Sequence, residues 1–168
     1  MMKIAIISDT HDNLATLNKA IAWINRNDIQ KIIHCGDIAS FETLQELSGL
    51  YAGEIQLVFG NMDDDYSLSE TLKSHPLANV IAHRKIGIIN IDDRRIAFTH
   101  FPRLAEDLAK SEKYDIVFYG HTHKPWEEKS DGTWLVNSGN LAGQFYKPSF
   151  ATYDTATDQL ELKVLENL

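Results

Sequence analysis

The chain has 168 residues, of which 43% are hydrophobic; this proportion is typical of a globular protein and excludes a disordered chain. Its 16 basic and 24 acidic residues give a formal net charge of −8, which argues against binding to long nucleic acid because affinity for the phosphate backbone comes from Lys and Arg. A single cysteine, Cys35, excludes an internal disulfide, and no run approaches the ~20 apolar residues that cross a bilayer, so we expect a cytoplasmic protein with no membrane segment.

The first third of the chain alternates strands and helices. Residues 3–8 are short, apolar and rich in β-branched residues, which predicts a buried strand. Asn13 is suited to cap a helix over 14–26, where apolar residues recur at helical spacing. A second strand is predicted over 31–35, a short helix over 42–50 and a third strand over 55–59. This order favours a parallel sheet with helices on its faces.

The rest of the chain is richer in strands. Strands are predicted over 79–83, 86–91, 94–99, 115–119, 133–137, 149–154 and 160–165. Asp92 and Asp93 form a plausible hairpin turn, and a helix is expected over 103–111, just after Pro102. Short turns between the later strands favour a second, more antiparallel sheet. No repeat or linker divides the chain, so we expect a single domain over 1–168 with two packed sheets and helices outside.

Seven polar side chains follow the predicted strands. They are Asp9, His11, Asp37, Asn61, His100, His121 and His123. Because ligands of open α/β sheets bind outside the carboxyl ends of the strands, residues far apart in sequence can meet there. In extended backbone, two residues separated by one position point to the same side, ~6.6 Å apart. The Asp9/His11 and His121/His123 pairs are therefore each predicted to reach into one cavity.

The donor types suit a pair of transition-metal ions. Imidazole favours ions such as Zn, Fe and Ni, carboxylate oxygens suit Mn, and the set is too rich in nitrogen for a dedicated Ca or Mg site. Glycine precedes three of the side chains, at positions 36, 60 and 120, where crowded loops need close backbone approach. Asp37, midway through the set, is the expected bridge. The sequence thus predicts two divalent metal ions, with Mn favoured and Fe, Zn, Ni or Co compatible.

Each of these segments alone also fits an ordinary structural role, such as a helix cap or a polar turn, so their joint occurrence carries the argument. The segments Ser8-Asp9-Thr10-His11, Gly36-Asp37, Gly60-Asn61, His100 and Gly120-His121-Thr122-His123 resemble the calcineurin-like metallophosphoesterase superfamily. They occur in the family's order over nearly the whole chain. The form Gly60-Asn61-Met62-Asp63 is similar to the small bacterial and archaeal phosphodiesterase branch. The resemblance implies an α/β fold, a four-layer α-β-β-α sandwich of two mixed sheets flanked by helices.

The resemblance also implies roles for individual residues. It places Asp9, His11, Asp37 and His123 on a first metal ion, and Asp37, Asn61, His100 and His121 on a second. It implies that Asp37, Asn61 and His100 take part directly in catalysis. Met62 stands where many family members have a histidine that protonates the leaving group. Asp63 matches the motif within an otherwise solvated acidic run, and it is expected to orient Asn61 or His100.

The function expected from these residues is hydrolysis of a small phosphodiester, in which a hydroxide that bridges two metal ions attacks phosphorus in line. Because Met62 cannot donate a proton, activated diesters should be cleaved better than alkyl esters. Three alternatives stay open: a phosphomonoesterase, a short-oligonucleotide nuclease, and a non-catalytic protein-interaction scaffold on the same fold. The presence of all seven coordinating side chains favours an enzyme. A homo-oligomer is compatible with the resemblance.

Overall fold

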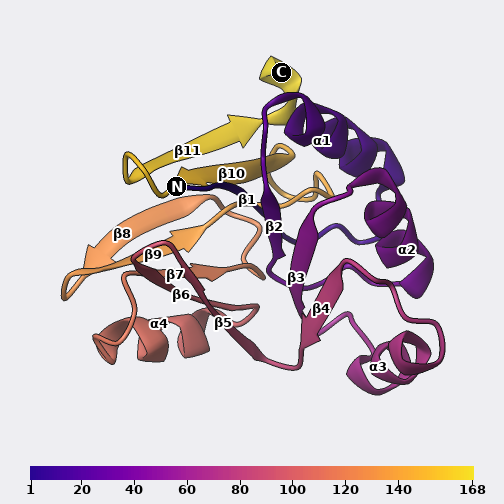
Figure 1. Ribbon diagram of the computed structural model, residues 1–168, viewed down its shortest axis with the longest axis horizontal. Helices are drawn as coiled ribbons and strands as arrows, with labels where there is room; N and C mark the ends of the chain where they lie inside the picture. The colour runs from indigo at the N-terminus through magenta and orange to yellow at the C-terminus, as the bar shows by residue number, and fades with distance from the viewer.

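Figure 1 shows the computed structural model of the chain, which describes residues 1–168 except for the side chain of Asp65. The helices are α1 (Leu14–Arg26), α2 (Phe41–Leu50), α3 (Asp65–Ser74), α4 (Pro102–Lys110) and the short 3₁₀ helix η1 (Leu165–Asn167). The strands are β1 (Lys3–Ile7), β2 (Lys31–His34), β3 (Glu54–Val58), β4 (Val80–His83), β5 (Ile86–Ile91), β6 (Arg94–Thr99), β7 (Ile116–Tyr119), β8 (Trp126–Ser130), β9 (Thr133–Asn137), β10 (Ser149–Asp154) and β11 (Gln159–Val164). The longest helix, α1, has 13 residues, and none of the described helices combines the length and apolar character of a bilayer span.

The first sheet has six strands in the order β11-β10-β1-β2-β3-β4. Strands β1 to β4 are parallel, with Ile6 of β1 opposite Ile33 of β2, as the alternation of strands and helices predicts. Strands β10 and β11 extend this sheet beyond β1 as antiparallel strands. The later strands were expected to form a second sheet, but β4, β10 and β11 join the first one. A period-two pattern identifies a strand but does not specify the partner beside which it lies.

The second sheet has five strands in the order β5-β6-β7-β9-β8. Its outer pairs, β5 with β6 and β8 with β9, are antiparallel, whereas β6, β7 and β9 are parallel. The predicted hairpin turn at Asp92 and Asp93 is confirmed, because Ile91 lies opposite Arg94 across it. The sheet is therefore mixed, and it is antiparallel only at its two edges.

Three elements, α3, β8 and the short η1, were not predicted. Helix α3 has a polar sequence with a weak apolar stripe, and the side chain of Asp64 caps it by accepting a hydrogen bond from the backbone N–H of Ser67. Strand β8, with the sequence WEEKS, is an exposed edge strand. Charged residues on edge strands are common because they discourage pairing with other chains, and they also remove the apolar alternation that marks a strand.

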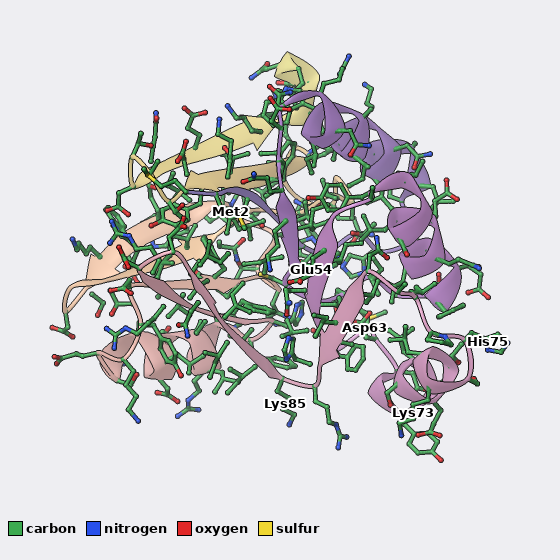
Figure 2. The ribbon with its side chains drawn as sticks, viewed as in Figure 1. Met2, Glu54, Asp63, Lys73, His75 and Lys85 are labelled. Atoms are coloured by element: carbon green, nitrogen blue, oxygen red, sulfur yellow. The ribbon has the colours of Figure 1, made fainter. Side chains whose placement is uncertain are left out.

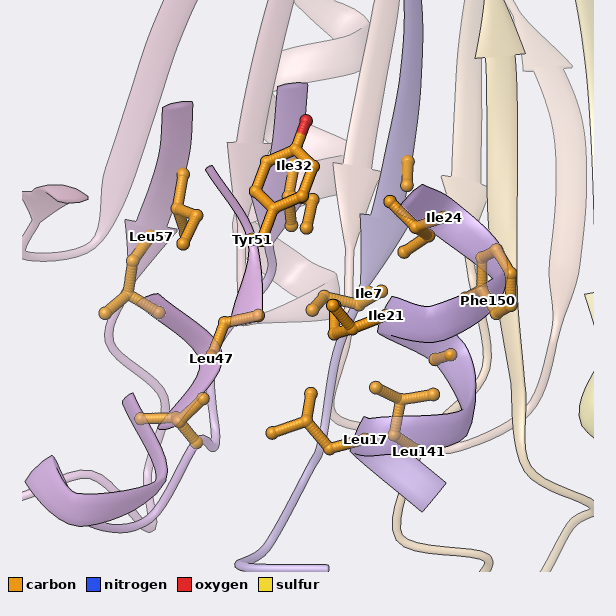
Figure 3. Close-up of a cluster of buried hydrophobic side chains, with 14 of the residues drawn as sticks. Ile7, Leu17, Ile21, Ile24, Ile32, Leu47, Tyr51, Leu57, Leu141 and Phe150 are labelled. Atoms are coloured by element: carbon orange, nitrogen blue, oxygen red, sulfur yellow. The ribbon is translucent and has the colours of Figure 1, made fainter. Parts of the chain in front are cut away.

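Three groups of buried side chains define four layers. Ile7, Ile32 and Leu57 of the first sheet pack against Ile21 of α1 and Leu47 of α2 (Figure 3). Between the two sheets, Ile4, Ile6 and Ile33 meet Phe98 and Phe118 of the second sheet. On the outer face of the second sheet, Ala97 and Val117 contact Ala105 and Ala109 of α4. The order is helices, sheet, sheet, helix, as Figure 1 shows, so the expected α-β-β-α sandwich is confirmed.

Candidate metal centre

The seven candidate side chains meet at one end of the sandwich. Each follows a parallel strand: β1 precedes Asp9 and His11, β2 precedes Asp37, and β3 precedes Asn61, while β6 and β7 of the other sheet precede the three remaining histidines. The carboxyl ends of parallel strands lie at the same edge of a sheet. The structure thus brings together every residue of the predicted set, from both sheets.

A first group consists of Asp9, His11 and His123. The Nε2 atoms of His11 and His123 lie 3.3 Å apart. Oδ1 of Asp9 is 3.3 Å from Nε2 of His123 and 3.8 Å from Nε2 of His11. One ligand atom from each residue lies within 4.8 Å of the other two, which is close enough for one cation to contact all three.

A second group consists of Asn61, His100 and His121. Oδ1 of Asn61 is 3.0 Å from Nε2 of His100 and 2.8 Å from Nδ1 of His121, and these two ring nitrogens are 3.2 Å apart. His100 is fully buried, whereas Asn61 and His121 are exposed. This side of the centre therefore faces solvent, while Asp9 and His100 lie beneath it.

Asp37 lies between the two groups. Its Oδ2 atom is 3.6 Å from Nε2 of His11 and 3.4 Å from Nε2 of His100. Its other oxygen, Oδ1, accepts a hydrogen bond of 2.8 Å from the backbone N–H of Met62. One oxygen of Asp37 thus faces both groups, and the second is occupied by the protein backbone.

The backbone that carries these side chains is not extended, which corrects the geometry expected for the two closely spaced pairs. Five of the seven residues have φ in the left-handed region, with values of 52° for Asp9, 44° for His11, 57° for Asp37, 72° for His121 and 59° for His123. Each left-handed residue turns the chain sharply after its strand, so the side chains converge through turns. Such conformations cost of order 1–3 kcal/mol each and cluster at functional sites.

Two glycines allow the loops to approach one another. A Cβ atom at Gly60 would lie 2.1 Å from Oδ1 of Asp37, and a Cβ atom at Gly120 would lie 2.0 Å from Oγ of Ser8. Neither distance is compatible with a side chain. The prediction that glycine at these positions serves close backbone approach is therefore confirmed.

Backbone carbonyls orient two of the imidazoles. Nδ1 of His100 is 2.8 Å from the carbonyl oxygen of Cys35, and Nδ1 of His123 is 3.4 Å from that of Gln144. A carbonyl oxygen only accepts hydrogen bonds, so in both rings Nδ1 carries the proton and donates it. Nε2 of each neutral ring then presents its lone pair to the centre, which is the arrangement that holds metal-binding histidines in place.

Asp63 has a different role from the one expected. It lies between the first sheet and α3 (Figure 2), and only 7% of it is exposed. Its Oδ2 accepts hydrogen bonds from the backbone N–H groups of Asp37 (2.8 Å) and Gly60 (2.7 Å), and its Oδ1 accepts one from that of Ala39 (2.8 Å). Asp63 therefore ties the loop after β2 to the loop after β3. It does not contact Asn61 or His100 among the described hydrogen bonds.

Two buried asparagines hold the loop of His121 and His123, a role that was not predicted for them from the sequence. The amide of Asn137 donates to the carbonyl of Gly120 (2.9 Å) and to Oγ1 of Thr122 (3.0 Å), and the amide of Asn140 donates to the carbonyl of His123 (3.1 Å). Both asparagines follow or end strand β9, the same position in the fold as the candidate ligands. Their position at the end of a parallel strand is the signal by which the sequence could have indicated this role.

The electrostatics of the centre favour positive charge. Burial would raise the pKa of Asp9, but contacts with His11 and His123 hold it below its ordinary value. Burial would also lower the pKa of His100, but the carboxylates of Asp37 and Asp9 raise it. The contact with Asp9 raises the pKa of His123. The two carboxylates thus stay ionised and draw protons, or metal cations in their place, into the centre.

The donor set fits divalent transition metals. Four imidazoles, two carboxylates and one amide oxygen converge, and Asp9, Asp37 and His100 form a further set of ligand atoms within 4.8 Å of one another. Imidazole and carboxylate together suit Mn, Fe, Zn and related ions. The close approach of imidazole nitrogens to each other and to carboxylates is the arrangement expected of residues that share a cation.

Comparison with known sequences gives consistent matches. A model of the calcineurin-like phosphoesterase superfamily domain matches residues 2–158. The phosphodiesterase MJ0936 of Methanocaldococcus jannaschii is 34% identical over 168 residues, which cover 98% of this chain and 100% of that protein. A probable metallophosphoesterase of the same organism, MJ0623, is 32% identical over 83% of this chain and 68% of its own length.

Solved structures agree with these matches. An archaeal phosphodiesterase superposes with a TM-score of 0.86 at 33% identity, over 97% of this chain and 99% of that one. Vps29 of Chaetomium thermophilum gives a TM-score of 0.72 at 17% identity, over 98% and 92% of the two chains. The phosphoesterase YfcE of E. coli gives 0.69 at 16% identity, over 98% and 100%. At their low identity, the last two show a shared fold alone.

Proposed function

Because the chain belongs to the calcineurin-like phosphoesterase superfamily, we propose that it is a phosphodiesterase that works with two divalent metal ions. The observation that carries this proposal is the position of Oδ2 of Asp37, 3.6 Å from Nε2 of His11 and 3.4 Å from Nε2 of His100. An oxygen that faces both groups of donors is suited to bridge two cations. The relatives that are phosphodiesterases support the choice of diester over other phosphate esters.

In the proposed site each ion would have four protein ligands. Asp9, His11, Asp37 and His123 would hold the first ion, and Asp37, Asn61, His100 and His121 the second. This division follows the two groups of short contacts, in which His11 faces His123 and His100 faces His121. Mn is the favoured metal because the set mixes imidazole with carboxylate and amide oxygens, and Fe, Zn, Ni or Co are compatible with it.

Two divalent ions bound here would supply an acidified water as nucleophile and positive charge for the phosphate oxygens. The protein's own contribution is to hold the donors in place. Asp37 keeps its orientation through the N–H of Met62, and His100 keeps its through the carbonyl of Cys35. Asn61 and His121 are exposed, so the diester would approach from their side.

The leaving group would receive no proton from the position after Asn61. Met62 occupies that position, its side chain is 58% exposed, and a thioether has no proton to donate. We therefore propose that the protein prefers diesters whose leaving group is a weak base, such as an aryl alcohol. Small phosphodiesters of this kind are the substrate class that fits a centre open to solvent at Asn61 and His121.

An interaction scaffold on the same fold is the competing function. The likeness to Vps29, at 17% identity, concerns the fold. The completeness of the donor set favours an enzyme, since a scaffold has no need of four imidazoles gathered around two partly or fully buried carboxylates.

The test combines metal analysis with an assay. The protein is loaded with Mn, its metal content is measured by mass spectrometry, and hydrolysis of bis(p-nitrophenyl) phosphate is compared with that of p-nitrophenyl phosphate. Asp37→Asn should lower diesterase activity by more than the roughly 10- to 100-fold that loss of an outer partner of a metal ligand costs. The same change at Asp131, in the exposed turn between β8 and β9, is the matched control. Less than one metal ion per chain, or full activity of Asp37→Asn, would refute the proposal.

A further inference from the structure

Phe145 places a bare aromatic ring beside the metal centre. It is 90% exposed, more than any other large hydrophobic side chain of the described residues. Leaving a phenyl ring in water forgoes the roughly 1.5–3 kcal/mol that burial of a large apolar side chain gains. Such exposure next to a candidate active centre therefore calls for a binding partner.

The backbone holds this ring outward at a cost. Phe145 has a φ of 65°, and the N–H of Tyr146 donates to the carbonyl of Gln144 at 2.7 Å, so Phe145 is the central residue of a tight γ-turn with positive φ. This form of the γ-turn is rare and strained, and a bulky residue in it is an outlier. A strained turn that exposes a large apolar side chain favours neither folding nor solubility, and strain of this kind is concentrated where ligands bind.

The turn is anchored to the candidate ligands. The buried side chain of Asn140 accepts hydrogen bonds from the N–H groups of Gly143 (2.6 Å) and Gln144 (3.2 Å), and it donates to the carbonyl of His123 (3.1 Å). The carbonyl of Gln144, directly before Phe145, accepts from Nδ1 of His123. The position of the phenyl ring is thus coupled to the position of His123 by fixed polar contacts.

The ring lies against the imidazole of His123. Its centroid is 5.7 Å from that of His123, with an angle of 62° between the ring planes. On the other side of the centre, Phe101 lies 5.2 Å from His100 and 6.2 Å from His121 by the same measure, but it is half-buried. Each group of donors therefore has a phenyl ring against its imidazoles, and the ring of Phe145 is the one whose faces are open.

We propose that Phe145 is a specificity residue that stacks on a planar aromatic group of the substrate, a nucleobase or an aryl ester carried on the phosphate. This inference rests on the proposed function and names the substrate class of the same centre. Stacking on an aromatic side chain tolerates different bases because every base has a π-face. A phosphate at the metal centre and an aromatic ring against Phe145 would then fix the two ends of one ligand.

The test compares two ligands that differ only in the base. AMP and ribose 5-phosphate share the sugar and the phosphate, and their dissociation constants for the Mn-loaded protein are measured by calorimetry without turnover. In the wild type AMP should bind about tenfold more tightly than ribose 5-phosphate, within the range known for base stacking. In Phe145→Ala this ratio should fall to about one, and in Phe145→Tyr it should be retained. Tyr146→Ala, which removes the neighbouring exposed aromatic ring, is the matched control and should keep the ratio.

The outcomes separate this inference from the proposed function. If the protein binds AMP in preference to ribose 5-phosphate through Phe145 but cleaves no diester, the stacking inference stands and the proposed enzymatic function fails. If the protein cleaves diesters but the ratio of its affinities for AMP and ribose 5-phosphate is the same in wild type and Phe145→Ala, the stacking inference is overturned. Phe145 would then serve contact with a protein. No binding of AMP at all would overturn it as well. Since Phe145 is exposed, Phe145→Ala should unfold at the wild-type temperature or above it, which excludes misfolding as a cause.

Discussion

The carboxylate of Asp63 accepts a hydrogen bond of 2.8 Å from the backbone N–H of Asp37, a residue 26 positions earlier in the chain. The same carboxylate binds the N–H groups of Ala39 and Gly60. One side chain thus holds the loop after β2 against the loop after β3. Asp37 faces both groups of candidate ligands, so its placement depends on a residue that touches none of the cations proposed here.

Asp63→Asn should therefore weaken metal binding without removing a ligand. The amide offers one acceptor oxygen in place of two and turns an NH₂ group toward backbone N–H donors, so at least one of the three hydrogen bonds is lost. We expect Mn affinity to fall by about 10- to 100-fold, as for other outer partners of metal ligands. Calorimetric titration with Mn measures this, and unchanged affinity would show that the loops hold without Asp63.

The adjacent residue provides the control for this change. Asp64 caps α3 through its side chain, which accepts from the N–H of Ser67. Asparagine caps helices about as well as aspartate. Asp64→Asn should therefore leave both Mn affinity and stability close to those of the wild type.

Gly60→Ala should disrupt the same region by crowding. The added Cβ atom would lie 2.1 Å from Oδ1 and 2.7 Å from the backbone nitrogen of Asp37, so the Asp37 carboxylate has to move. We expect loss of Mn binding together with a decrease of about 1–3 kcal/mol in the free energy of unfolding, the usual cost of overpacking. Urea unfolding and metal titration together measure both effects.

Gly49→Ala is the opposite case and serves as the control. Gly49 lies within α2, and a Cβ added there would have no heavy atom within 4 Å apart from its chain neighbours and the backbone of its own helix. Alanine in a helix is more favourable than glycine by about 0.5–1 kcal/mol. A stabilised Gly49→Ala with normal metal binding would show that the effect at Gly60 comes from the contact with Asp37.

From the sequence one can predict the fold class and the side chains that meet at the candidate site, but not the position of every strand. His121 and His123 could be placed at a strand end because chain order and parallel strands determine where the carboxyl ends lie. The sheet to which β10 belongs could not be predicted, because its apolar pattern is the same in either sheet. The role of Asp63 also escaped prediction, since its three hydrogen bonds depend on how β2 and β3 align in space. The left-handed turns at the candidate ligands were not predicted, because aspartate and histidine are enriched in that conformation but adopt it in only a minority of cases.

His34 should make stability depend on pH. It is fully buried, its Nδ1 accepts from the N–H of Gly36, and its Nε2 therefore carries the proton that it donates to Oγ1 of Thr10. Burial lowers its pKa from 6.5 to about 4. Below pH 6.5 the unfolded chain thus binds a proton at His34 that the folded protein does not bind. The free energy of unfolding therefore decreases as the pH falls from 6.5, and this decrease ends near pH 4.

The contribution of His34 is measured against a variant that cannot titrate there. His34→Gln keeps a donor that can reach Thr10 and has no pKa in this range. Between about pH 7 and about pH 5, the free energy of unfolding of the wild type should fall by about 2 kcal/mol more than that of His34→Gln. Urea unfolding in the presence of a chelator excludes effects of metal release. Parallel pH profiles for the two proteins would mean that His34 is protonated in the folded state.

Met62→His should change how the rate depends on the leaving group. Met62 directly follows Asn61, its side chain is exposed, and its N–H holds Oδ1 of Asp37, so a histidine there would sit at the mouth of the centre with its backbone role intact. General acid catalysis matters most for leaving groups that are strong bases, because these depart poorly without a proton. A series of methyl aryl phosphodiesters with phenols of rising pKa measures the effect.

We expect the wild-type rate to fall steeply along this series and the rate of Met62→His to fall less. The expected gain of Met62→His is about tenfold at the most basic phenol, below the 10²–10⁴ of an evolved general acid. Met62→Leu, which changes size and shape but adds no proton donor, should keep the wild-type slope. Equal slopes for Met62→His and Met62→Leu would mean that the proton of the leaving group comes from solvent or another side chain, whichever residue follows Asn61.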